Sequence, residues 1–172
     1  PARFMLVGTM NPEEGDLRPQ LLDRFALSVE IYGIRETRER VSIMERNLAF
    51  ENNPDKFRAE WVTKEEDLSH QIGRARSLID QVTHSSRDLL WIAQLSSSLQ
   101  VDGHRADLVI LKAARAQAAF EGRTAITARD IALAAELALP HRIRRGPFQK
   151  EEITMEQLQD RIDQLEGGSS QG

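Results

Sequence analysis

The chain has 172 residues, of which 40% are hydrophobic and 29% charged, with a formal net charge of −4. The lack of cysteine excludes disulfides and thiol catalysis, and the four histidines (His70, His84, His104 and His141) lack the spacing of metal ligands, so no metal site is expected. The acidic balance disfavours nucleic-acid binding, no apolar run approaches the roughly 18 residues of a membrane span, and no signal peptide is visible, so we expect a cytoplasmic protein.

The first expected element is a short buried strand over residues 4–7, and Asn11 lies just beyond its end. Ligands of open α/β sheets lie beyond the carboxyl ends of the strands. Asn11 is therefore placed to contact a phosphate or to orient an attacking water. The alternative is that Asn11-Pro12 only begins a turn, a role that both residues favour.

A short helix is predicted to begin at Pro19 and to carry Asp23 and Arg24 at its end. The guanidinium of Arg24 is planar and permanently charged. Supplied to a neighbouring subunit's nucleotide, it would stabilise the charge that develops during phosphoryl transfer. The alternative is a surface ion pair between Asp23 and Arg24, worth roughly 0 to 1 kcal/mol.

At these motifs the chain resembles the I subunit of magnesium chelatase, an AAA+ ATPase. The resemblance rests on TMNPEEG at 9–15, RPQLLDRF at 18–25, VDGHRAD at 101–107 and AAFEGR at 118–123, and it extends to about residue 145. It implies that Asn11 is the sensor 1 residue, which acts in cis. It also implies that Arg24 is the arginine finger, which acts in trans, and that Asp23 is its inter-subunit companion.

The resemblance further implies that Arg105 is the sensor 2 residue, which contacts the nucleotide of its own subunit. Gly103 interrupts the chain before an apolar-periodic run and Asp102 is a suitable cap, so Arg105 falls in the first turn of a helix. A cation there opposes the helix dipole. The alternative is a solvated arginine paired with Asp102 or Asp107. The neighbours of Arg105, which are His104 and Ala106, depart from the Leu and Gly that are usual in photosynthetic I subunits.

The parts that grip ATP are missing from the chain. It has no Gly-x-x-x-x-Gly-Lys-Ser/Thr loop and no strand that ends in a paired-acid motif. We therefore expect the C-terminal portion of a longer ATPase, in which ATP and Mg²⁺ bind between ring neighbours. The fragment alone is expected to be inactive.

Beyond a second expected strand at 28–32, the sequence predicts only helices. Asn52-Asn53-Pro54 ends the first, a stripe from Leu68 to Val82 marks the second, and Ser85 or Ser86 caps the third. The fourth runs from about 105 to 120 and is stopped by Gly122, and a capping box at 127–130 starts a fifth that Pro140 ends. These stripes have no sheet to cover and should pack on each other as a bundle.

The expected fold class is therefore mainly α, with a helical lid bundle of an AAA+ ATPase preceded by a two-strand remnant of its α/β domain. The expected parts are a remnant at 1–34, a linker helix region at 35–66, a lid with sensor 2 at 67–145, and a charged helix with a flexible tail at 146–172.

A cationic run at 141–150 precedes an acidic stretch at 151–166. One interpretation is that these opposite charges offset each other across a loop. The other is that the arginines face a subunit boundary or the acidic linker of a partner.

By resemblance, the intact protein would form a homo-oligomeric, hexameric ring and couple ATP hydrolysis to insertion of Mg²⁺ into protoporphyrin IX. Its partners would be a D-type AAA+ subunit and a porphyrin-binding H-type subunit. One alternative is an AAA+ remodelling ATPase that serves another metal chelatase or a partner with a metal-dependent adhesion domain. Another is a helical interaction module without catalysis.

Overall fold

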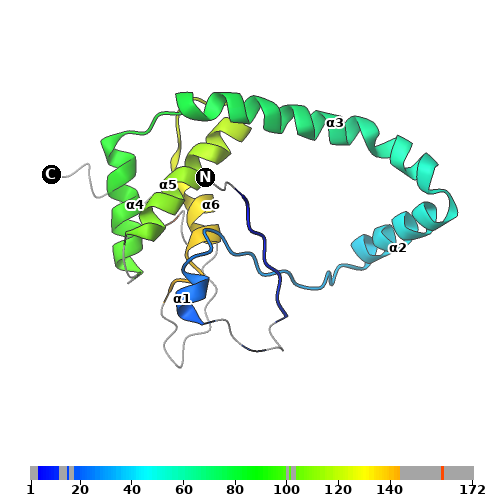
Figure 1. Cartoon of the computed structure of the whole chain (residues 1–172), viewed down its shortest axis with the longest axis horizontal. Helices are drawn as coiled ribbons and strands as arrows, with labels where there is room; N and C mark the ends of the chain where they lie inside the picture. Colours follow the sequence, from blue (N-terminus) through cyan, green and yellow to red (C-terminus); the bar gives the residue numbers. More distant parts are fainter. Residues whose placement is uncertain are drawn as a thin grey trace.

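The computed structural model describes residues 4–11, 15, 18–99, 101, 104–143 and 160, and it is mainly helical (Figure 1). The elements in chain order are α1 (Pro19–Leu22), α2 (Thr37–Asn52), α3 (Pro54–Leu78), the 3₁₀ turn η2 (Ile79–Gln81), α4 (Ser86–Ser98), α5 (Arg105–Phe120) and α6 (Ala128–Ala138). Among these helices, none combines the length and apolar character needed to cross a bilayer. The expected charged helix at 146–172 lies outside the described residues, apart from residue 160.

The core is a bundle formed by α4, α5 and α6. Large apolar side chains from these helices, and from Leu139 directly after α6, are fully buried in the core, among them Ile92, Leu95, Ile110 and Ile131. Small side chains line α5 and α6, where Ala114, Ala118, Ala134, Ala135 and Ala138 are also buried. Because alanine side chains are small, these two helices pack closely along their length (Figure 1). The predicted helical bundle is thus confirmed.

The helix ends follow the local signals in the sequence. The backbone N–H of Ser85 donates to Asp88 at 2.6 Å, and that of Thr127 donates to Asp130 at 2.7 Å, so both helices begin with a capping box. Gly122, which follows α5, has a φ of +76° that an L side chain rarely adopts.

Helices α2 and α3 form an arm that extends from the bundle (Figure 1). Asn53 separates them and caps α3 by accepting from the N–H of Lys56 at 3.0 Å. Neither helix has a buried residue. Helix α3 continues through the boundary expected between residues 66 and 67, and its last turns pack on the core through Ala75 and Leu78. The division of the chain into domains stays a prediction.

The two expected strands do not form, and this part of the prediction is wrong for the structure described. Residues 4–7 and 28–32 are neither strand nor helix, and the described residues hold only one isolated bridge, between Thr83 and Ala125. A strand exists only through hydrogen bonds to a neighbouring strand, and the part of the chain that the structure describes places no strand beside these segments. Their apolar side chains therefore remain exposed, with Met5 at 85% and Ile31 at 91%.

Candidate functional site

The short helix α1 is followed by a turn that carries Asp23 and Arg24. Helix-like hydrogen bonds continue past its end, from Arg24 N–H to the Leu21 carbonyl and from Phe25 N–H to the Leu22 carbonyl, both at 3.0 Å. Residues 23–26, called the finger turn below, then lie against the end of α6. Ser28 extends this contact because its N–H donates to the Leu137 carbonyl at 2.9 Å.

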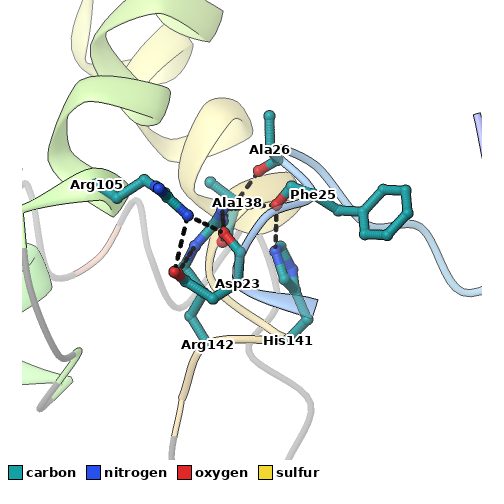
Figure 2. A network of polar contacts seen from close by, with 7 residues as sticks. All are labelled: Asp23, Phe25, Ala26, Arg105, Ala138, His141 and Arg142. Atoms are coloured by element: carbon teal, nitrogen blue, oxygen red, sulfur yellow. Dashed lines mark hydrogen bonds and ion pairs between the residues drawn. The ribbon is translucent and has the colours of Figure 1, made fainter. Parts of the chain in front are cut away.

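Arg142, which follows α6, anchors the finger turn (Figure 2). Its side chain is only 3% exposed. Its guanidinium donates to the carbonyls of Phe25 at 2.6 Å and Ala26 at 2.9 Å. It also donates to the carbonyl of Ala138, in the last turn of α6. One buried side chain therefore joins the turn and the bundle.

The carboxylate of Asp23 lies between two arginines (Figure 2). Arg105 Nη1 donates to Oδ2 at 3.0 Å, and Arg142 Nε donates to Oδ1 at 3.3 Å. Arg105 also donates to the Asp23 backbone carbonyl at 3.2 Å. The side chains of Asp23 and Arg105 are 49% and 56% exposed, so both remain open to a ligand or a neighbouring molecule.

His141 makes a second contact with the same turn. Its Nε2 lies 3.0 Å from the Phe25 carbonyl, which can only accept, so Nε2 carries the proton. Burial lowers the pKa of His141, the charge of Arg142 lowers it further, and the Phe25 carbonyl opposes the shift. The ring is therefore neutral near pH 7, and its Nδ1 is buried without a partner in the described part of the chain.

The structure brings two of the four predicted site residues together. Asp23 pairs with Arg105 and Arg142 rather than with Arg24, which replaces the interpretation of Asp23 and Arg24 as a surface ion pair. Arg105 likewise does not pair with Asp107, and Asp102 lies outside the described residues.

The other two predicted residues, Asn11 and Arg24, are both exposed. Arg24 is exposed, and within the described residues its side chain makes no hydrogen bond or ion pair. Asn11 is also exposed, in the segment 4–11.

Sequence reasoning missed the roles of His141 and Arg142. It treated both as part of a cationic run at 141–150, of which the structure describes only 141–143. The available signal was weak: these two residues directly follow Pro140, which ends the helix predicted from the capping box at 127–130, and a cation at that end of a helix is stabilised by the helix dipole.

The two predicted arginines could each bind phosphate. The side chain of Arg24 is exposed and that of Arg105 is 56% exposed, and guanidinium binds phosphate oxygens in a bidentate manner. Among the described residues, no cluster of His, Asp or Glu could hold a metal ion.

Comparison with known proteins decides what the bundle is. Residues 91–163 match the family described as the AAA lid domain. This part of the chain is therefore similar to an AAA lid domain. Helices α5 and α6 lie inside this match, together with Arg105 and Arg142, whereas the finger turn lies outside it and is docked onto the lid.

Relatives extend the similarity beyond the lid. The chain is 46% identical to magnesium-chelatase subunit ChlI of Synechocystis over 87% of its length, and 41% identical to a ChlI homolog of Methanocaldococcus jannaschii over 96%. It is 47% identical over 94% of its length to an uncharacterized protein of Mycobacterium tuberculosis. These alignments cover 42%, 45% and 26% of the relatives, so the chain spans less than half of each. The resemblance to magnesium chelatase I subunits is confirmed.

Proposed function

We propose that this chain is part of an AAA+ ATPase subunit of magnesium chelatase type. In the intact protein, ATP hydrolysis would be coupled to insertion of Mg²⁺ into protoporphyrin IX. The observation that carries the proposal is the Asp23 carboxylate, which ties the element bearing Arg24 to Arg105 of the AAA lid. A motor needs such a connection between a phosphate-sensing side chain and a domain that moves.

In this proposal Arg24 is the arginine finger, which acts on the nucleotide of a neighbouring subunit. An exposed guanidinium on a docked turn, with no partner among the described residues, is the form in which a finger can be supplied in trans. Asn11 remains the proposed sensor 1 residue, which acts in cis. The side chain of Asp23 is half-exposed, so Asp23 can also contact the neighbouring subunit, and it stays the proposed inter-subunit companion of Arg24.

For Arg105 we propose a different assignment from the action in cis that the family resemblance implies. Consecutive Cα atoms are about 3.8 Å apart, so Arg24 begins beside the carboxylate that Arg105 contacts. A neighbouring subunit that approaches the turn carrying Arg24 would therefore also approach Arg105, whose side chain is 56% exposed. We therefore assign both arginines to one trans site.

The nucleotide itself would be held elsewhere in the intact subunit. ATP and Mg²⁺ are the proposed cofactors, bound by segments that this chain does not include. The proposed partners are further copies in a ring, a D-type AAA+ subunit and a porphyrin-binding H-type subunit, and the proposed location is the cytoplasm.

Mixed rings test this function. The full-length Arg24→Ala protein should lose most of its ATPase activity, since an arginine finger is worth roughly 10³-fold or more in turnover. Mixing it with a protein that has an inactive phosphate-binding loop but an intact Arg24 should restore activity.

The matched control is Arg129→Ala, because Arg129 is an exposed arginine on α6 that is not part of the network. Full activity of the pure Arg24→Ala protein would refute the finger role.

A further inference from the structure

We propose that Arg142 is a positioning residue, which fixes the finger turn to the AAA lid so that Arg24 and Arg105 reach a neighbouring nucleotide as one unit. This inference rests on the proposed function. It concerns a residue that touches no nucleotide itself.

The hydrogen bonds of Arg142 leave it no capacity for a ligand. An arginine has five N–H donors. Nε donates to Asp23 Oδ1, Nη1 to the carbonyls of Ala26 and Ala138, and Nη2 to the carbonyls of Asp23 and Phe25. Every N–H therefore has an acceptor within the chain. Because this guanidinium is buried and all of its N–H groups are engaged, it holds the neighbouring backbone in place and does not bind phosphate.

The acceptors explain what Arg142 fixes. Three of them are carbonyls of the finger turn, from residues on both sides of Arg24, so the backbone that carries Arg24 is curled around one guanidinium. The fourth carbonyl belongs to Ala138, near the C-terminus of α6, where a cation is stabilised by the helix dipole. Movement of the lid must therefore move Arg24.

Asp23 links Arg142 to Arg105, but the position of Asp23 does not depend on its contact with Arg105. One carboxylate oxygen contacts the buried Arg142 and the other contacts the half-exposed Arg105. A phosphate that draws Arg105 away leaves the contact between Asp23 and Arg142 in place. The finger turn therefore stays docked when Arg105 changes partner.

Lysine cannot replace this residue. Its ammonium keeps the charge but has three donors at one point, which cannot reach three carbonyls of the turn, one of the helix and a carboxylate together. In full-length Arg142→Lys we expect kcat for ATP hydrolysis to fall roughly ten- to a hundredfold, since small misplacement of a reacting group has such effects. KM for ATP should change much less, because the subunit's own binding loop is intact.

Mixed rings distinguish positioning from a general structural role. Arg142 acts through groups that serve the neighbour, so mixing Arg142→Lys with the protein that has an inactive phosphate-binding loop and an intact Arg142 should restore activity. A subunit with a damaged fold would stay inactive in the same mixture. Failure of recovery, or an unchanged kcat in the pure protein, overturns the inference.

A matched control lies in the same lid. Arg115 donates to the carbonyls of Val82 and Ile79 at 3.1 and 2.9 Å and does not contact the finger turn. Arg115→Lys should lower the melting temperature and leave kcat close to wild type. If both lysine variants lower kcat equally, the effect is not specific to the turn.

If Arg142→Lys does not fold, a second variant tests the same inference. His141→Phe removes only the hydrogen bond to the Phe25 carbonyl and should give a smaller loss of kcat with the same recovery on mixing. Absence of any recovery for it overturns the inference. Failure of the proposed function would be seen separately, as full activity of Arg24→Ala.

Discussion

At the scale of single residues, the stability of the docked turn should depend on whether His141 is protonated. It donates one hydrogen bond to the finger turn, its second ring nitrogen is buried, and the charge of Arg142 lies beside it. A proton added to Nδ1 would be a buried charge without an acceptor, next to another cation. Such a charge is costly to bury.

This predicts a pH dependence of stability with a definite sign. The pKa of His141 in the folded chain lies below the ordinary value of 6.5, so below about pH 6.5 the unfolded chain binds more protons than the folded chain. The contribution of His141 is therefore complete above pH 6.5 and is lost as the pH falls toward the lower, folded pKa. Urea denaturation at a series of pH values between about 7.5 and 5.5 measures this slope.

The variant that isolates the effect is His141→Gln, since a glutamine amide can still donate to the Phe25 carbonyl but does not titrate in this range. It should reduce the slope. His70→Gln, on the exposed surface of α3, serves as the control. Equal slopes for wild type and His141→Gln would contradict this account.

Residue roles were predictable only where a motif carried them. Asp23, Arg24 and Arg105 lie in recognisable motifs, and the structure brings Asp23 and Arg105 together. Arg142 lies in no such motif, and its partners in the finger turn are 116 to 119 residues away in sequence. Nothing local distinguishes a buried arginine with five acceptors from a solvated one.

At the scale of elements, the link between α5 and α6 depends on one buried carboxylate. Asp130 is 2% exposed and accepts from Arg123 at 2.6 and 2.7 Å and from the Thr127 N–H at 2.7 Å. Burial raises the pKa of Asp130, but the hydrogen bonds from Arg123 and Thr127 outweigh it and the net shift is downward. The carboxylate is therefore charged and fixes both the loop and the first turn of α6.

Asp130→Asn should lower the free energy of unfolding by about 3 kcal/mol, because it removes a buried charge that pairs with Arg123, whose side chain is 33% exposed. The midpoint of urea denaturation measures the loss. Glu121→Gln is the control, since Glu121 is a more exposed partner of the same arginine and should give a much smaller change. Similar midpoints for the two variants would show that the burial of Asp130 does not matter.

Elements were predictable where their signals were local. The helix start at Thr127, the stop at Gly122 and the break at Asn53 each depend on contacts within a few residues, and all are present. The expected strands at 4–7 and 28–32 depend on partners elsewhere in a sheet, which the described residues do not supply. An apolar run predicts that a segment will be buried, but it does not identify the strand that would pair with that segment.

At the scale of the whole molecule, the finger turn and the AAA lid form one mechanical unit. The turn is joined to α6 through Arg142 and to α5 through the pairing of Asp23 with Arg105 (Figure 2). In the proposed ring, such a unit would present Arg24 and Arg105 to the same neighbour. Arg105 would then act in trans, which differs from the action in cis that the family resemblance implies.

The most direct test of this claim is the ATPase activity of full-length Arg105→Ala mixed with a protein that has an inactive phosphate-binding loop and an intact Arg105. In the mixture, the only functional nucleotide sites lie in subunits that lack Arg105. If Arg105 acts in trans, its neighbour supplies it and activity returns, which is the result that we predict. If the pure Arg105→Ala protein is impaired and the mixture shows no recovery, Arg105 serves its own subunit, and the shared trans site is wrong.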